Sequence, residues 1–222
     1  MRTSTPLFLL LLVLLTARGA CAAGDIFGVW APRGQTNTFS PDDPQMRKGD
    51  SMPMQPWAAE KFKNTKSGYG PNATAESEDP TFQCYPPGMP LILLIPFPME
   101  VIEAKDRIIM YFEFSNLMRQ IYMDGREHPK DLMPSYMGHS IGRWEGDTLV
   151  VDTVGLTDKS WLDRVGHPHS DALHIVERIR RRDKDTLEFD LTFDDVKAYT
   201  ADRKSTRLNS SHTDISRMPS SA

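Results

Sequence analysis

Residues 186–194 read TLEFDLTFD, and this stretch decides the fold class. Leu187, Phe189, Leu191 and Phe193 occupy every second position, and the residues between them are acidic or carry a hydroxyl group. Successive side chains of a β-strand point to opposite faces of the sheet. The alternation therefore predicts a strand with one buried face and one solvated face.

The same two-residue period recurs along the second half of the chain and predicts a series of strands. Runs rich in β-branched and aromatic residues, bounded by turn signals, cover residues 99–104, 107–114, 117–124, 148–154, 173–182 and 186–193. Consecutive hairpins without intervening helices form an antiparallel meander. We therefore expect a mostly β domain over residues 91–202 that closes as a lipocalin-like barrel, with a β-sandwich as the alternative.

The preceding stretch, residues 23–90, is rich in proline and glycine and has little periodicity. We expect it to form a long irregular N-terminal arm with at most one or two short helices. Residues 57–64 are the predicted helix, because a proline suits the first turn. Residues 26–30 are expected to form a short strand. The apolar run 91–95 is interpreted as a core or edge strand, since it is far too short to span a membrane.

Both ends of the chain are expected to lie outside the domain. Arg2, the apolar run 7–15 and the small residues around Cys21 form the pattern of a signal peptide. We expect residues 1–22 to be cleaved and the protein to be periplasmic or secreted. Residues 203–222 differ in composition and lack an apolar period, so they are interpreted as a non-native tail and excluded from the fold. A natural disordered tail is the alternative.

The charge balance disfavours one class of partner. The whole chain has 26 basic and 30 acidic side chains. Residues 23–202 hold 20 of the basic and 29 of the acidic groups, which gives this part a formal charge of −9. An acidic domain repels phosphate backbones, so no nucleic-acid partner is expected.

One basic stripe has a structural explanation. Arg178, Arg180 and Arg182 alternate on the solvated face of one predicted strand, and Glu188 and Asp190 alternate on the next. Opposite charges on adjacent strands stabilise their pairing. We therefore predict cross-strand ion pairs here.

The histidines suggest a metal site. His167 and His169 are two positions apart, and alternate side chains of an extended segment point to the same side. Both imidazoles could therefore bind one divalent ion such as zinc, with His139 or a carboxylate as a third ligand and an open position for water. Ordinary hydrogen bonding by loop histidines is the alternative.

Two charged side chains interrupt otherwise apolar strand faces. Glu177 stands among leucine and isoleucine at alternate positions, and Arg119 stands between Leu117 and Ile121. A charge on an inward face must be paired or hydrogen-bonded. Glu177 and Arg119 are therefore expected to share a sheltered interior with Glu113. This group is either a structural ion pair or a site that orients a ligand or moves protons.

The stretch MGHSIGRWEGDTLVVDTVG, residues 137–155, carries a family resemblance. Together with DGREHP at 124–129, WLDRVGHPHS at 161–170 and ALHIVERIRRRD at 172–183, it resembles an uncharacterised family of secreted proteins of Acidobacteria and other environmental bacteria. The resemblance implies an exported β protein and no particular activity. It also implies that the family continues past residue 200, so a final strand is expected to be missing.

Three functional hypotheses follow from these patterns. The first is an exported barrel that binds a small, partly apolar ligand. The second is a hydrolase or lyase that uses a metal or acid/base chemistry. The third is a structural or interaction module of the cell envelope. The candidate residues are Glu113, Arg119, Trp144 and Trp161 for ligand binding, Glu177, His169 and His139 for catalysis, and His139, His167 and His169 for metal binding.

Overall fold

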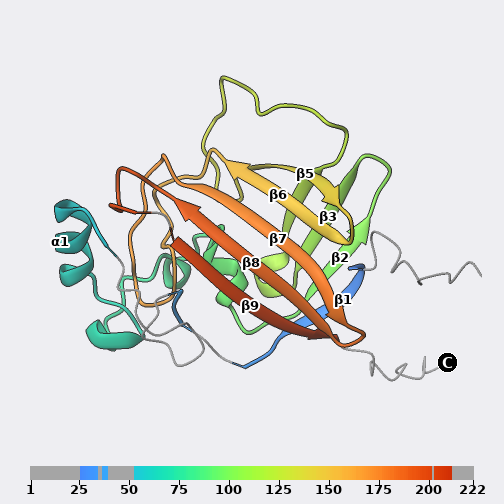
Figure 1. Ribbon diagram of the computed structural model, residues 1–222. Helices are drawn as coiled ribbons and strands as arrows, with labels where there is room; N and C mark the ends of the chain where they lie inside the picture. The colour runs from blue at the N-terminus through green and yellow to red at the C-terminus, as the bar shows by residue number, and fades with distance from the viewer. Residues whose placement is uncertain (1–25, 35–36, 40–52, 202, 212–222) are drawn as a thin grey trace, which may run out of the picture.

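The computed structural model describes residues 26–34, 37–39, 53–201 and 203–211, and its strands form a closed barrel (Figure 1). The order of the strands around the barrel follows the chain, and β9 closes it by pairing with β1. The strands are β1 Gly28–Pro32, β2 Met99–Glu103, β3 Arg107–Phe112, β4 Leu117–Tyr122, β5 His139–Glu145, β6 Thr148–Val154, β7 His174–Asp183, β8 Thr186–Asp194 and β9 Arg203–Ser211.

The predicted fold class is confirmed. The pairs of neighbouring strands are antiparallel except for β4 and β5, which form a short parallel ladder at Ile121 and Tyr122. A parallel pair needs a connection that returns along the strands. Residues 123–138 make this return as the long loop at the top of Figure 1.

The alternating patterns place the core as expected. Leu187, Phe189, Leu191 and Phe193 of β8 are all buried in the main hydrophobic cluster. Burying each such side chain stabilises the fold by about 1.5–3 kcal/mol. The predicted strands between residues 99 and 193 all appear, with ends within two residues of those expected.

The helical segments are short and join the strands. The described residues contain one α-helix, α1 Pro56–Asn64, close to the range predicted. The other helical segments of the described residues are short 3₁₀ turns. Within the described residues, no helix has the length and apolar character needed to cross a membrane. The 3₁₀ turns are η1 Gly70–Asn72, η2 Pro80–Gln83, η3 Leu91–Leu94 and η4 Phe114–Asn116.

The prediction of a strand at residues 91–95 is wrong. Residues 91–94 form η3, and all four of its side chains are buried. The amide of Ile92 donates to the carbonyl of Gly88 at 2.9 Å, and the amide of Leu93 donates to Pro90 at 3.0 Å. A short run that is apolar at every position has no period, so it does not distinguish a buried strand from a buried turn.

Two strands were not expected. Strand β5 contains Gly142, whose missing side chain lets β5 approach β4: a Cβ there would lie 2.8 Å from Ile121 and 2.6 Å from Met123. Residues 203–211, which were excluded from the fold, form β9 and pair with β8 and β1. Their exclusion is therefore wrong, because pairing of backbone groups does not require an apolar period. Their non-native origin stays a prediction.

Several connections gather at one end of the barrel, here named the loop end. The turn 113–116 and the segments 155–173 and 195–201 all lie there, next to strand ends. The helix α1 is fixed at the same end, since the indole of Trp57 donates to the carbonyl of Lys197 at 2.6 Å. Figure 1 shows α1 beside these segments. The predicted signal peptide, residues 1–22, lies outside the described residues.

Candidate functional site

Arg119 of β4 and Glu177 of β7 form an ion pair inside the barrel. One guanidinium nitrogen, Nη1, donates to Glu177 Oε1 at 3.0 Å, and Nη2 donates to Oε2. The two side chains are 1% and 0% exposed. The expectation that they share a sheltered interior is confirmed.

The neighbouring strands complete this network with hydroxyl groups. Arg119 Nε donates to Ser140 Oγ of β5 at 3.1 Å, and Nη2 donates to Thr153 Oγ1 of β6 at 2.8 Å. The remaining N–H of Nη1 faces the sulfur of Met110 at 3.8 Å. All five N–H donors of the guanidinium thus have an acceptor. We name these five residues the lumen network.

The lumen network leaves little scope for chemistry. Both carboxylate oxygens of Glu177 accept hydrogen bonds from Arg119, and no part of the side chain reaches solvent. A general base must reach the substrate proton within hydrogen-bond distance, which a side chain with no exposed atom does not do here. The geometry therefore favours the structural ion pair among the alternatives for this group.

The other predicted ligand-contacting residues lie elsewhere. Glu113 is exposed at the turn after β3, so the expectation that it faces the interior is wrong. The inward-facing residues of β3 are Ile108, Met110 and Phe112, so Glu113 shares the outward parity of Tyr111 and also lies beyond the end of the strand. Trp144 is partly buried against the core, and Trp161 is buried in the segment 155–173.

The predicted metal ligands His139, His167 and His169 do not converge. His167 Nδ1 pairs with Asp163 Oδ2 at 2.7 Å, and its ring stacks on Phe62 at 4.1 Å. Across the described ranges, no group of three or more His, Cys, Asp or Glu side chains is arranged to hold a metal ion. The metal site predicted for these three residues is therefore not formed.

The local backbone explains why the same-side rule fails for His167 and His169. Their segment belongs to no strand, and loop contacts position each ring: the amide of Leu162 donates to the carbonyl of His167 at 2.8 Å. His169 turns to another partner, with Nε2 3.0 Å from Ser160 Oγ and Nδ1 3.1 Å from the carbonyl of Ser170. Burial lowers the pKa of His169 below its usual value.

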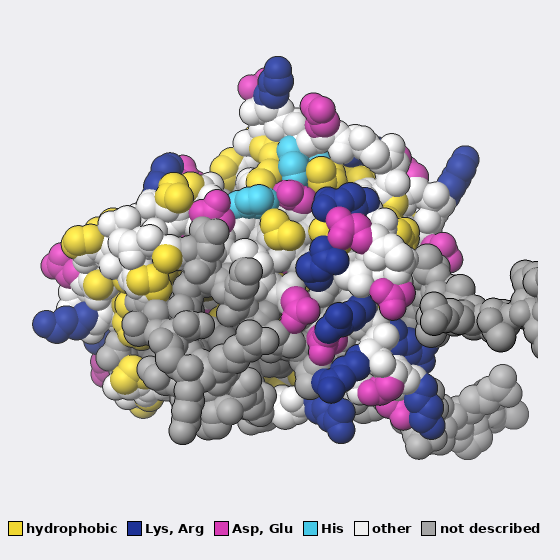
Figure 2. Space-filling view, in the orientation of Figure 1, with side chains coloured by type: hydrophobic (Ala, Val, Ile, Leu, Met, Phe, Trp, Pro, Cys, Tyr) yellow, Lys and Arg dark blue, Asp and Glu magenta, His cyan; other side chains and the backbone are white. Residues whose placement is uncertain are grey.

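His139 belongs to a different cluster on the outer face of the barrel. Its Nδ1 lies 2.8 Å from Nδ1 of His128, which comes from the loop 123–138. Asp152 Oδ1 lies 3.1 Å from His128 Nε2 and 2.9 Å from His174 Nε2. Partial burial, with smaller effects of His128 and Arg126, lowers the pKa of His139. Figure 2 shows histidine and acidic side chains gathered on this surface.

Figure 2 also shows Lys and Arg side chains interleaved with Asp and Glu along the strands. Arg180 bonds to Glu188 with its Nε at 2.6 Å, and Arg182 lies 3.8 Å from the same carboxylate. Arg178 pairs with Glu145 of β5 at 2.8 Å. The prediction of cross-strand ion pairs is confirmed for Arg180, and Arg178 finds its partner two strands away.

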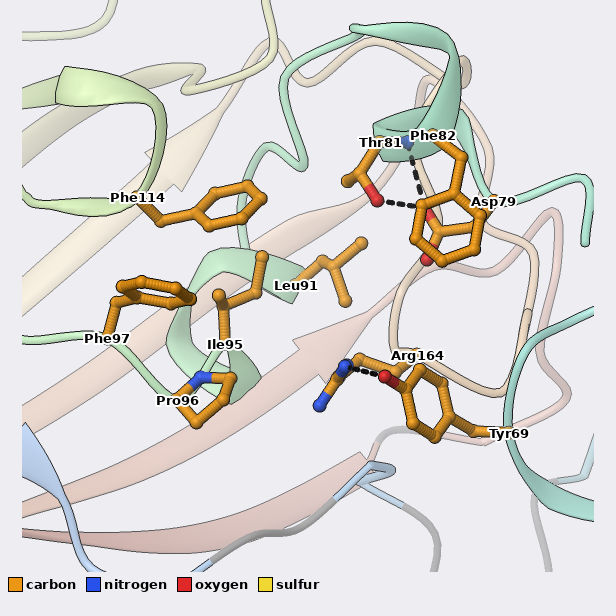
Figure 3. Close-up of a pocket in the computed structure, with 10 residues that line it drawn as sticks. All are labelled: Tyr69, Asp79, Thr81, Phe82, Leu91, Ile95, Pro96, Phe97, Phe114 and Arg164. Carbon is orange, nitrogen blue, oxygen red and sulfur yellow. Dashed lines mark hydrogen bonds between the residues drawn. The ribbon is translucent and has the colours of Figure 1, made fainter.

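A pocket of about 130 Å³ opens at the loop end (Figure 3). Figure 3 shows Phe97 and Phe114 on one side, Arg164 and Tyr69 on another, and Leu91 and Ile95 between them. None of its lining residues belongs to the lumen network. The lining residues are Tyr69, Asp79, Thr81, Phe82, Leu91, Ile95, Pro96, Phe97, Phe114 and Arg164.

The polar edge of this pocket is built around Arg164. Its Nη1 donates to Asn37 Oδ1 at 3.0 Å, its Nη2 donates to the hydroxyl of Tyr69, and its guanidinium lies 3.9 Å from the centre of the Tyr69 ring. A further cavity beside Asn209 measures about 10 Å³, roughly the space that one water needs. The larger pocket is thus the better candidate for an organic ligand.

No family model and no curated protein matches the chain. The resemblance to secreted proteins of environmental bacteria therefore stays a prediction. The functional argument rests on the geometry of the pocket. Sequence reasoning missed Tyr69, Phe97, Phe114 and Arg164, because they lie in turns and irregular segments where no period marks a side chain as inward-facing.

We predict that breaking the lumen ion pair is costly. Glu177→Gln leaves a buried guanidinium without its counter-charge, so the free energy of unfolding should fall by about 3–5 kcal/mol. The double variant Arg119→Met/Glu177→Leu removes both charges and should recover most of this loss. Urea denaturation measures both. The exposed pair provides the control, since Arg178→Met should cost no more than about 1 kcal/mol. Equal losses for Glu177→Gln and Arg178→Met would contradict the assignment.

The lowered histidine pKa values predict a loss of stability in acid. A histidine of the unfolded chain has a pKa of about 6.5, whereas His169 and His139 bind a proton only at lower pH. The unfolded state therefore holds more protons below pH 6.5, and the free energy of unfolding falls as the pH drops, by at most about 1.4 kcal/mol per pH unit for each group. We expect the free energy of unfolding, measured by urea denaturation at pH values between 7.5 and 5.5, to fall less steeply with decreasing pH for His169→Gln than for the native chain. An equally steep fall would count against the role of His169.

Proposed function

We propose that this chain is an exported β-barrel domain that binds a small, partly apolar ligand in the pocket at the loop end. The observation that carries the proposal is the pocket itself: about 130 Å³, lined mainly by apolar and aromatic side chains, with a few polar groups at its edge. Concave apolar sites with few convergent polar groups are typical of small-molecule binding. The signal-peptide pattern of residues 1–22 supports export.

The size of the pocket limits the ligand. A cavity of about 150 Å³ lined by leucine, isoleucine and phenylalanine accepts benzene in a well-studied engineered protein. A pocket of about 130 Å³ therefore suits a single aromatic ring or a short aliphatic chain. Larger ligands would have to extend past Phe82 and Phe97, which are 65% and 44% exposed at the pocket rim.

The wall of the pocket is already formed without a ligand. Leu91 and Ile95 belong to the buried segment around η3, and their side chains are 1% and 7% exposed. The rings of Phe97 and Phe114 pack against each other with centroids 5.4 Å apart. Such a prearranged wall lowers the entropic cost of binding.

The geometry disfavours the enzyme hypothesis in the form suggested by the sequence. Both carboxylate oxygens of Glu177 bond to Arg119 and are buried. His139 lies in a cluster on the outer face, apart from His167 and His169. A catalytic group must reach the substrate within hydrogen-bond distance. Binding in the pocket requires none of these side chains.

Titration with benzyl alcohol, a neutral single-ring compound, tests the proposal. We expect saturable binding with a dissociation constant of about 1 mM, followed by amide chemical shifts or calorimetry. Phe97→Ala removes one aromatic wall and should weaken binding about fivefold to tenfold. Tyr85→Ala, which removes another exposed aromatic ring outside the pocket, should leave it unchanged. Absence of saturable binding at tens of millimolar would overturn the proposal.

A further inference from the structure

We infer that the ligand of the loop-end pocket is a monocyclic aromatic carboxylate, whose ring lies among the apolar side chains and whose carboxylate binds Arg164 and Tyr69. This inference rests on the proposed function and adds the chemical class of the ligand. It follows from the charge, the hydrogen-bonding capacity and the size of the pocket, which are independent observations.

The first observation is the state of the Arg164 charge. The guanidinium is half-buried, and no carboxylate of the described residues lies within the 4.0 Å of an ion pair. Other arginines of the barrel have such partners, as Arg107 has Asp106 and Arg126 has Asp124. A partly desolvated cation without a counter-charge is a favourable partner for an anionic ligand.

The second observation is the number of free donors. Arg164 has five N–H groups, and two of them are used by Asn37 and Tyr69. Among the described residues, no acceptor bonds to the other three. The Tyr69 hydroxyl accepts from Arg164, so its own hydrogen can be donated. A carboxylate has two oxygens, and these two neighbouring donors can satisfy one each.

The donors are also held in place before a ligand arrives. The guanidinium of Arg164 lies 3.9 Å from the centre of the Tyr69 ring, and Asn37 bonds both its side chain and its backbone amide. A charged group that is already oriented loses less freedom when it binds a carboxylate. The arrangement therefore favours binding of a carboxylate in one orientation over non-specific attraction of anions.

A second charged group of the pocket sets the charge of the ligand. Asp79 also lines the pocket, and its Oδ1 accepts from the amide and the hydroxyl of Thr81 at 2.8 and 2.7 Å. These two bonds stabilise the carboxylate as the cap of η2. Because Asp79 repels added negative charge, a pocket with one cation and one anion repels a doubly charged phosphate more than a singly charged carboxylate.

The experiment compares three ligands of the same size: benzoate, benzyl alcohol and benzylamine. Each is titrated into the protein by calorimetry at low salt. We expect benzoate to bind about tenfold or more tightly than benzyl alcohol, because charge-assisted hydrogen bonds are the stronger kind. Benzylamine should bind no better than benzyl alcohol, and added salt should weaken benzoate alone.

Three variants locate the effect. Arg164→Gln should lower the affinity for benzoate to about that for benzyl alcohol and so remove the preference for the anion. Tyr69→Phe keeps the ring but removes the donor, so it should weaken benzoate about threefold to tenfold. Arg126→Gln is the matched control, since that guanidinium also lies 3.9 Å over a tyrosine ring but outside the pocket. Thermal melting confirms that each variant is folded.

The outcomes separate the inference from the proposed function. If benzyl alcohol binds and benzoate has no advantage, or if Arg164→Gln leaves that advantage intact, the carboxylate inference is overturned and the binding function stands. Tighter binding of benzylamine would also overturn it, in favour of recognition by Asp79. If none of the three ligands binds, both the inference and the proposed function fail.

Discussion

A buried ion pair between Arg119 and Glu177 determines what this barrel can and cannot do. Removing two charges from water costs several kcal/mol for each ion, and here the cost is offset because every donor of the guanidinium has an acceptor. Ser140 and Thr153 supply the acceptors that the carboxylate does not. The network therefore requires β4, β5, β6 and β7 to keep their register. It also places a paired, fully buried charge inside the barrel.

The charged side chains inside the barrel are buried and bonded to each other, whereas the pocket at the loop end has space for a ligand. The segments that meet there come from distant parts of the chain, and the barrel holds them together through the ends of its strands. The result is a small apolar pocket with Arg164 at its edge. The outer face of the barrel is different in kind, because its arginines, Arg178 and Arg180 among them, are paired with carboxylates. Recognition of an anion is thus favoured at the pocket rather than along the strands.

The sequence predicted the parts of this structure that have a period. Alternation identified the strands between residues 99 and 193, and it also marked Arg119 and Glu177 as inward-facing charges that need each other. Alternation could not predict η3, because an unbroken apolar run does not distinguish a strand from a turn. It could not predict β9 either, because polar residues can pair through their backbone groups. His167 and His169 separate because each ring has its own partner in an irregular segment, and the position of Arg164 depends on packing between distant segments.

On the proposed function, ligands bind at the loop end and not at the Arg119–Glu177 pair inside the barrel. An amide chemical-shift map of the protein titrated with benzoate distinguishes these two places. We expect the largest shifts at Tyr69, Phe114 and Arg164, while the amides around Arg119 and Glu177 stay unchanged. Large shifts centred on Arg119 and Glu177, with none at the loop end, would show that the ligand binds inside the barrel instead.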